Sequence, residues 1–254
     1  MTTTQHGATA RPRSQYRQKL IGGLVLALGL MVSGCASNSP NAPYDPYESF
    51  NRKIFKLNLQ LDRSVARPLA QGYVAVVPKP AREGVHNFLG NLDQPVIFIN
   101  KVLQGEPDDA GDTLARFFVD STAGIGGLID VASLMGIPDH STDFGITLGR
   151  WGFNQGPFLM LPLIGPTTPR DLTGKLVDIG LAPSTYIQYR SSLYYGLGAG
   201  FLGILDARAQ RLGQVESLER TSLDFYATTR NLYLQYRAAK VNRGKPNIQN
   251  LPNF

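Results

Sequence analysis

The sequence has very little of the chemistry that enzymes and metalloproteins use. It contains one cysteine and three histidines in 254 residues, so neither a disulfide framework nor a thiolate metal site is expected. It has no H-E-x-x-H pair, no G-x-S-x-G elbow, no S-x-x-K pair and no phosphate-binding loop. A Ser–His–Asp triad that the fold builds around His86 or His140 stays open, because triads are recognised by geometry. The sequence otherwise predicts a protein that is not an enzyme and binds no metal or cofactor.

The N-terminal region lacks acidic residues and carries four cations before a short apolar run. The run covers residues 20–32, and its 13 residues are too few for a hydrocarbon core that needs about 20. The cations ahead of it are Arg11, Arg13, Arg17 and Lys19. A positive region followed by a short apolar region is typical of a secretory signal peptide, which we expect over residues 1–34.

The single cysteine, Cys35, directly follows this apolar run. The sequence Val32-Ser33-Gly34-Cys35 resembles the lipobox of bacterial lipoproteins. The resemblance implies that the mature protein begins at Cys35 with covalent lipid, and that residues 35–46 form a lipidated tether. Ala36 stands where an aspartate would resemble an inner-membrane retention signal, which implies the outer membrane, with the lipid in its periplasmic leaflet. Several acyl chains, each contributing about 0.8 kcal/mol per buried CH2, make such an anchor permanent. The alternative is that Cys35 is a buried or incidental thiol that carries no lipid.

The positive charge of the chain says little about nucleic acid once the signal peptide is removed. Residues 1–34 hold four of the 25 Lys and Arg and none of the 19 Asp and Glu, so the formal net charge falls from +6 to +2. We therefore expect no nucleic-acid partner. No acid follows Asp224, and residues 241–254 are expected to be a polar, basic tail. Solvent exposure of this tail is favoured over contact with anionic lipid headgroups.

Helical periodicity dominates residues 47–240, and strand alternation is scarce, so the sequence predicts a mainly α domain there. One helix is expected to begin near Tyr47 and to end at Pro68. An extended piece at residues 74–77 and a short helix at residues 81–89 are expected to follow.

Proline and glycine also delimit the later helices. A helix over residues 95–104 is apolar all round and is expected to be deeply buried or to face lipid. Pro107 is expected to begin a helix whose acidic first turn is solvated and complements the helix dipole. The C-terminal third is expected to form two long helices, the second amphipathic from Val215 to Tyr236.

The segment Trp151–Pro169 has 19 residues without a charge, which is long enough for a membrane span. Four prolines and three glycines exclude a continuous helix. Irregular backbone is tolerated at membrane depth only when it packs in protein or lines a cavity. The segment is therefore expected to be an apolar loop beside a cavity, or an ordinary buried connector.

A second uncharged run, Ser191–Leu205, contains a literal G-x-G-x-x-G. Dinucleotide binding is not favoured, because no strand precedes the glycines and no βαβ unit surrounds them. Gly196 and Gly200 are expected to form a small-residue face for close helix packing.

Eight blocks, in order along the chain, resemble the MlaA (VacJ) family of outer-membrane lipoproteins. The blocks are Asp45–Arg52, Asn87–Leu92, Asn100–Gly105, Arg116-Phe117, Gly127–Ala132, Asp143–Gly145, Gly156–Pro162 and Gly165–Asp171. The resemblance implies a helical ring that is embedded in one leaflet of the outer membrane, with a central channel and an apolar Gly/Pro-rich loop. It implies that mislocalised phospholipids leave the outer leaflet through the channel and pass to a periplasmic carrier protein, and that the lipoprotein associates with trimeric porins. A structural, porin-associated lipoprotein without transport is the alternative.

The resemblance also suggests residues that carry the function. Gly152, Asn154 and Gly156 occupy the hinge positions of the loop, where the family commonly has three glycines. Because Asn accepts left-handed backbone less freely than Gly, the hinge is expected to be stiffer than usual. Asp120 stands where the family usually has Asn, which would place a negative charge near phosphate if the side chain approaches the channel. Functional contacts are also expected at Phe50, Asn51 and Arg52, with helix packing as the alternative role.

Overall fold

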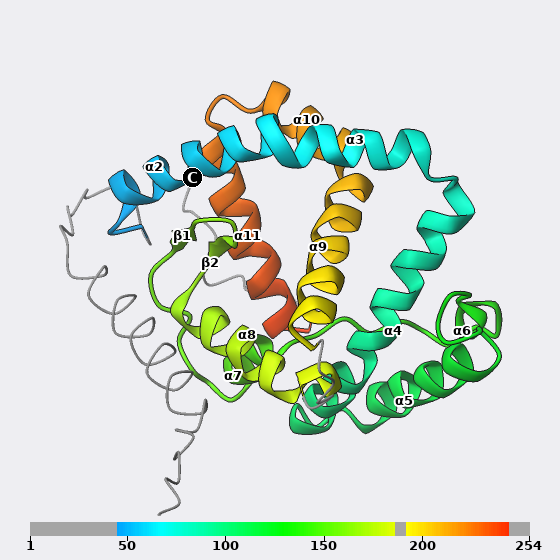
Figure 1. Ribbon diagram of the computed structural model, residues 1–254. Coiled ribbons are helices and arrows are strands. Elements are labelled where there is room, and N and C mark those ends of the chain that lie inside the picture. Colours follow the sequence, from blue (N-terminus) through cyan, green and yellow to red (C-terminus); the bar gives the residue numbers. More distant parts are fainter. Residues whose placement is uncertain (1–44, 186–191, 244–254) are drawn as a thin grey trace, which may run out of the picture. The chain divides into compact units, whose positions relative to one another are not determined.

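The computed structural model describes residues 45–185 and 192–243, which are mainly helical (Figure 1). Cys35 and most of its tether, residues 186–191 and residues 244–254 of the expected tail lie outside the described residues. The first helices are α2 (Glu48–Leu61), the π-helical turn η2 (Asp62–Ala66), α3 (Arg67–Val76), α4 (Lys79–Leu103), α5 (Pro107–Thr122), α6 (Val131–Leu134) and α7 (Phe144–Arg150). Next come the antiparallel strands β1 (Leu159–Leu161) and β2 (Gly165–Thr167), α8 (Pro169–Leu181), the 3-10 turn η3 (Pro183–Thr185), α9 (Ser192–Gln210), α10 (Leu212–Thr221) and α11 (Phe225–Val241). The predicted mainly α class is confirmed. Within the described ranges, no helix is long and apolar enough to cross a membrane.

Helix α2, the turn η2 and α3 follow one another without a break, so the predicted helix end at Pro68 is wrong (blue to cyan in Figure 1). Proline normally interrupts a helix because it lacks an N–H. Here the N–H of Arg67 bonds the carbonyl of Asp62, five residues earlier, and Pro68 falls in the first turn of α3. A first turn needs no intrahelical donor, so the proline is tolerated there. The predicted extended piece at 74–77 is also wrong, except for the extended residue Val77 that ends α3.

Helix α4 continues through Pro95, where the sequence predicted a separate short helix and a new start. Pro95 has no N–H and so costs α4 one backbone hydrogen bond. Side-chain hydrogen bonds that fix α4 on both sides of the proline compensate for this loss. Before it, Asn91 donates to the Ser121 hydroxyl of α5 at 2.9 Å; after it, Asn100 donates to Asp178 of α8 at 2.9 Å. The predicted helix end at residue 104 is confirmed, since Gln104 caps α4.

The first turn of α5 is acidic, as predicted, but it is not simply solvated. Asp109 accepts from Nζ of Lys101 at 2.6 Å, and Asp112 lies 3.0 Å from Nε2 of His140. These contacts tie the start of α5 to the end of α4 and to the loop before α7.

Between Ser192 and Val241 the structure describes three helices, α9, α10 and α11, where the sequence predicted two long ones. The predicted amphipathic run is interrupted at Ser222, whose backbone is extended, and α11 begins after Asp224. The Asp224 carboxylate accepts from the N–H of Ala227 at 3.1 Å and so caps the new helix. In α9, a Cβ built on Gly200 meets no described atom within 4 Å, so the described residues show no close packing at Gly200; the surroundings of Gly196, the other predicted position, lie outside what the structure describes.

The described side chains are sorted unusually, with polar groups inside and apolar groups outside. Sixteen polar or charged residues are buried and only eight apolar ones, whereas 28 large apolar side chains are exposed. The apolar core consists of Phe158, Met160 and Tyr226, with Ile54, Phe55, Tyr233 and Leu234 packed against it. This core lies where β1, α2 and α11 meet. A water-soluble domain places most large apolar side chains inside, so this distribution indicates a different surrounding.

Candidate functional site at the hairpin and the helices that hold it

Two asparagines of α2 hold the backbone of the hairpin. Asn51 donates through Nδ2 to the carbonyl of Phe158 at 3.0 Å and accepts at Oδ1 from the N–H of Met160 at 2.9 Å. Asn58 repeats this two turns later, with the Leu161 carbonyl and the Leu163 N–H, both at 2.9 Å. Seven helical residues rise about 10.5 Å and three strand residues about 10 Å, so the two spacings match. The amides of α2 thus act as an additional hydrogen-bonding edge for the hairpin.

Asn51 was predicted as a functional contact, and the structure places it in the interior. It is fully buried and donates also to Asp45 at 2.7 Å, so its amide is committed to the protein. Asn58 was not identified from the sequence. The available signal was the pair of asparagines seven residues apart on one face of an otherwise apolar-faced helix.

Arg52 fastens α2 to the start of α11. Its guanidinium bonds both oxygens of Asp224, at 3.2 and 2.6 Å, and Nε donates to Glu48 at 2.7 Å. It also lies over the ring of Tyr226, 4.4 Å from the centroid. The hydrogen bond from Arg52 is the main reason why the pKa of Asp224 lies below its usual value. Phe50, the third predicted contact on this helix, is 43% exposed.

The apolar segment Trp151–Pro169 has two parts with different surroundings. Phe158 and Met160 are buried in the core, whereas Trp151, Phe153 and Leu163 are exposed. The indole of Trp151 donates to the carbonyl of Leu103 at 3.0 Å and thereby attaches the start of the segment to the end of α4. The segment therefore combines a fixed hairpin with an exposed apolar stretch ahead of it.

The three predicted hinge residues behave differently from one another. Gly152 and Gly156 have φ of +94° and +73°, in the left-handed region that favours glycine. Asn154 is not among the residues with positive φ, so the reason given for a stiffer hinge does not apply. Its Oδ1 accepts from the N–H of Gly156 at 3.3 Å, which stabilises the turn instead. A Cβ on Gly156 would lie 3.1 Å from Cγ of Pro169, whereas a Cβ on Gly152 would meet no described atom within 4 Å.

A buried ion-pair network fixes the far end of the segment, just after Pro169. Asp171 accepts from Nε and NH2 of Arg237 at 2.9 and 2.7 Å and from the hydroxyl of Tyr233 at 2.6 Å. Arg237 also bonds Asp143 at the start of α7. Burial alone would raise the pKa of Asp171, but the bonds from Arg237 and Tyr233 outweigh it, and the pKa is lowered. One arginine of α11 thus joins α7, α8 and the end of the apolar segment.

Asp120 is buried, and its carboxylate is bonded to the backbone. The sequence suggested a negative charge near phosphate if this side chain faced the channel, and its burial does not fit that arrangement. Its Oδ1 accepts from the N–H of Ala132 at 2.9 Å, and Oδ2 lies 3.9 Å from NH2 of Arg116. These contacts fix the turn between α5 and α6.

The two histidines of the described chain are paired with carboxylates. His86 lies 2.9 Å from Asp206, and His140 lies close to Asp109 and Asp112. Neither has a hydrogen bond to a serine hydroxyl within residues 45–185 and 192–243, and no group of metal-ligating side chains gathers there.

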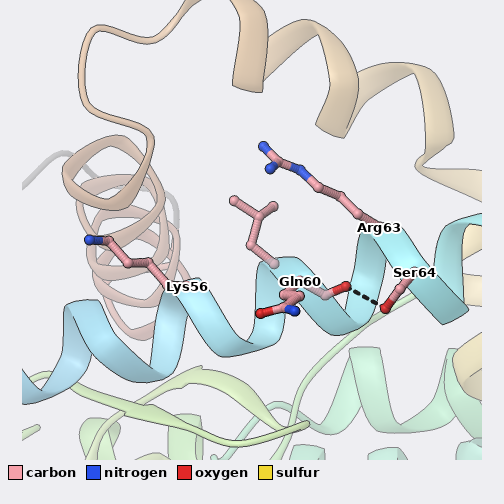
Figure 2. A pocket seen from close by; sticks show the side chains of 5 residues that line it. Lys56, Gln60, Arg63 and Ser64 are labelled. Atoms are coloured by element: carbon pink, nitrogen blue, oxygen red, sulfur yellow. Dashed lines mark hydrogen bonds between the residues drawn. The ribbon is translucent and has the colours of Figure 1, made fainter.

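A hollow of about 460 Å3 opens beside α2 and η2 (Figure 2). It is lined by Lys56, Leu59, Gln60, Arg63 and Ser64. Figure 2 shows Lys56 and Arg63 projecting from the helix on either side of Gln60, with the Ser64 hydroxyl bonded to the Gln60 carbonyl. Arg63 is paired with Glu219 of α10, whereas Lys56 has no ion pair within the described ranges. The hollow thus offers an apolar floor and one available cation.

Residues 43–240 match the family described as MlaA lipoprotein. The chain belongs to this family. It is similar to the intermembrane phospholipid transport system lipoprotein MlaA of Haemophilus influenzae, with 38% identity over 87% of this chain and 90% of that protein. The protein of the same name from Escherichia coli strain K12 is 36% identical over 90% of this chain and 92% of its own length. A solved structure, described as the structural basis for maintenance of bacterial outer membrane lipid asymmetry, superposes with a TM-score of 0.70 at 35% identity. The superposition covers 78% of this chain and 99% of that one.

The MlaA match includes α2, the apolar segment and α11, and so the whole candidate site. The predicted family is therefore confirmed. Within this MlaA chain, the structure brings Asn51 and Arg52 to the hairpin and α11, and the hinge glycines precede that hairpin. Asp120 belongs to the separate corner of α5 and α6.

Proposed function

We propose that this protein is an outer-membrane lipoprotein that transports phospholipids between membranes and maintains the lipid asymmetry of the outer membrane. Its MlaA relatives carry the name of such a transport system. The observation that carries the proposal is the sorting of side chains, with polar groups buried and 28 large apolar side chains exposed. A surface of this kind is stable beside lipid acyl chains and costly in water. The role is that of a transport component and not of an enzyme.

We further propose that the helices surround a water-accessible channel. A closed circuit of contacts supports this: α2 continues into α3 and α4, α4 contacts α7, α7 contacts α11, and α11 returns to α2. Asp93 of α4 and Lys175 of α8 are both exposed to solvent. Even so, partial desolvation by the surrounding protein is the main cause that raises the pKa of Asp93 and lowers the pKa of Lys175. Groups that are both open to water and crowded by protein are expected on a concave wall. A polar passage would suit headgroups, while acyl chains stay on the apolar exterior.

In this proposal, residues 1–34 are removed, Cys35 carries the lipid anchor, residues 35–46 act as a tether, and residues 241–254 form a basic tail. The helical domain of residues 47–240 sits in the periplasmic leaflet and takes mislocalised phospholipids from the outer leaflet. It passes them to a soluble periplasmic carrier and associates with trimeric porins. The segment Trp151–Pro169 is proposed to lie against the channel, with Gly152 and Gly156 as its hinges.

Deleting the gene tests the proposal directly. Excess phospholipid in the outer leaflet, detected by surface labelling, and increased sensitivity to detergent are expected, and a plasmid copy should reverse both. Normal outer-leaflet composition in the deletion strain would contradict transport. Retained porin association together with normal asymmetry would favour the structural alternative.

A further inference from the structure

A small cavity lies where the end of α3, the start of α4 and the end of α9 meet. Its volume is about 130 Å3, room for about four water molecules. It is lined by Tyr73, Lys79, Arg82, Glu83, Asp206, Ala209 and Gln210. The hairpin and its supporting helices use none of these residues.

Asp206 provides a buried negative charge at this cavity. Its side chain is nearly inaccessible, and Oδ2 lies 2.9 Å from Nδ1 of His86 and 3.5 Å from Nε2 of Gln210. No hydrogen bond to Oδ1 occurs in the described part of the chain. A buried carboxylate is stable only when its oxygens are bonded, so Oδ1 has acceptor capacity for a cationic group.

The hydroxyl of Tyr73 is buried and has no partner in the described ranges. Burial, followed by the charge of Asp206, raises the pKa of Tyr73, so the hydroxyl keeps its proton at neutral pH. A hydroxyl donates one hydrogen bond and accepts others, and here it lies among groups of both charges. A buried hydroxyl without a partner is costly, which indicates that a polar ligand or water completes the site.

Arg82 and Lys79 provide the positive charge. Nε of Arg82 donates to the carbonyl of Val77 at 3.1 Å, which fixes the guanidinium at the corner between α3 and α4. Its terminal nitrogens make no hydrogen bond within the described residues, and a guanidinium suits phosphate oxygens. Lys79 lies in the first turn of α4, where the helix dipole also favours an anion.

The cavity thus has two cations and, with Glu83, two anions. Lys79 lies 3.4 Å from Glu83, so these two charges already offset each other, and Arg82 and Asp206 remain as the opposite charges open to a ligand. A free phosphate ion would face the Asp206 carboxylate, whereas a zwitterion complements both signs. Apolar surface adjoins these residues, since Val76 follows Tyr73 by three positions, Leu202 precedes Asp206 by one turn, and both are exposed. We propose that the cavity binds the headgroup of an amine-bearing, zwitterionic phospholipid. The ammonium bonds Asp206, the phosphate bonds Arg82 and Lys79, and the Tyr73 hydroxyl bonds both. This inference rests on the proposed function for the lipid and adds the class of headgroup.

Calorimetric titration of the purified full-length protein in detergent micelles tests the inference. The probes are dihexanoyl phosphatidylethanolamine, dihexanoyl phosphatidylglycerol and inorganic phosphate. We expect the ethanolamine lipid to bind at least tenfold more tightly than the other two. Tyr73→Phe removes only a hydroxyl that has no partner among the described residues and is expected to weaken ethanolamine-lipid binding about five- to tenfold. Asp206→Asn is expected to weaken it at least tenfold and to leave phosphatidylglycerol binding nearly unchanged.

Tyr236→Phe, on the exposed surface of α11, is the matched control and should bind like the parent. Equal affinity for the two lipids, phosphate binding as tight as lipid binding, or unchanged affinity in Tyr73→Phe would overturn the inference. The Tyr73 variant decides the question if Asp206→Asn fails to fold. A parent protein that restores lipid asymmetry while its cavity variants bind normally would remove this inference and leave the proposed function intact. A deletion strain with normal asymmetry would remove the proposed function, whatever the titration shows.

Discussion

Single polar side chains, more than apolar packing, join distant parts of this protein. Asn51 and Asn58 bond the hairpin backbone from α2, and Arg237 joins α7 and α8 from α11. Small residues matter where helices approach most closely. A Cβ on Gly174 of α8 would lie 2.2 Å from the backbone nitrogen of Gly145 in α7. The roles of these residues depend on partners far away in the sequence.

Replacing Asn58 with Ala is expected to destabilise the protein by about 1–3 kcal/mol, because a carbonyl and an N–H of the hairpin lose their partner. Thermal unfolding followed by circular dichroism measures the loss. Asn231→Ala, at an exposed position of α11, is the control and should change stability by less than about 0.5 kcal/mol. Equal losses in the two variants would contradict the proposed clamp.

Replacing Gly174 with Ala is expected to force α7 and α8 apart and to lower the unfolding free energy by about 2 kcal/mol or more. The control is Gly180→Ala on the same helix, where a Cβ meets no described atom within 4 Å. That control should be neutral or stabilising by up to about 1 kcal/mol, because Ala is the better helix former. Urea denaturation of both variants gives the comparison, and a Gly174 variant as stable as its control would exclude the close contact.

Among the structural elements, the apolar segment stands out because it is fixed at Trp151 and at the hairpin, while Phe153 between these attachments is exposed. Trp151 is bonded to the end of α4, and the hairpin is held by α2 and the Asp171 network. Gly152 and Gly156 lie between these attachments with left-handed backbone. We therefore expect any bending of the segment to occur at these two glycines.

The double replacement of Gly152 and Gly156 with Val is expected to change transport without unfolding the protein. Valine disfavours positive φ strongly, so the exposed stretch would adopt another conformation. Outer-leaflet phospholipid in a complemented deletion strain is the measurement, with porin co-purification in parallel. Altered lipid asymmetry with porin association retained is expected. Unchanged asymmetry would show that the segment is no hinge for transport.

Glu106, the residue before α5, ties together the ends of three helices. It bonds Lys101 of α4 at 2.9 Å and contacts Arg150 of α7 at 2.7 Å, and Arg243 just after α11 lies 3.3 Å away. Burial raises its pKa, but the hydrogen bonds from Arg150 and Lys101 outweigh this and lower the pKa from 4.5 to about 2. A carboxyl group whose pKa is lowered in the folded protein stabilises the fold when the pH is above the pKa that the group has in the unfolded chain.

Stability from Glu106 should therefore be complete above about pH 4.5 and be lost progressively as the pH falls to about 2. Glu106→Gln is expected to lower the unfolding free energy at pH 7 and to flatten its pH dependence within that window. The exposed Glu83→Gln is the control and should follow the parent curve. Urea midpoints between pH 2 and 7 measure the effect, and parallel curves for Glu106→Gln and the parent would refute it.

For the whole molecule, the apolar exterior and the proposed anchor at Cys35 act together. Under the proposed function, the exposed apolar side chains would hold the domain in one leaflet. The anchor would fix which membrane the domain enters.

A Cys35→Ala protein is therefore expected to partition into membranes but to fail in localisation and function. Membrane fractionation and surface labelling of outer-leaflet phospholipid measure the two properties. Full maintenance of lipid asymmetry by the variant would show that the anchor is dispensable.

Patterns confined to short stretches predicted the structure well, and patterns that depend on distant partners did not. The helix end at Gln104 and the helix start at Pro107 were predicted correctly, because proline and glycine act on the local backbone. The continuation of the helices through Pro68 and Pro95 was not predicted. A π-helical turn compensates for the missing N–H of Pro68, and contacts to α5 and α8 compensate for that of Pro95. Arg52 was found as a candidate, but its partner Asp224 lies 172 residues away.

The sequence by itself determined the mainly α class and the MlaA family, because helical periodicity and ordered motifs are properties of the chain alone. Tertiary structure decided that Asn51 and Asp120 are committed to the backbone and that Asn154 stabilises a turn without left-handed strain. It also decided which side chains face outward, and so revealed a polar interior. The physical reason is that burial and pairing of polar groups depend on neighbours that only the folded chain brings together.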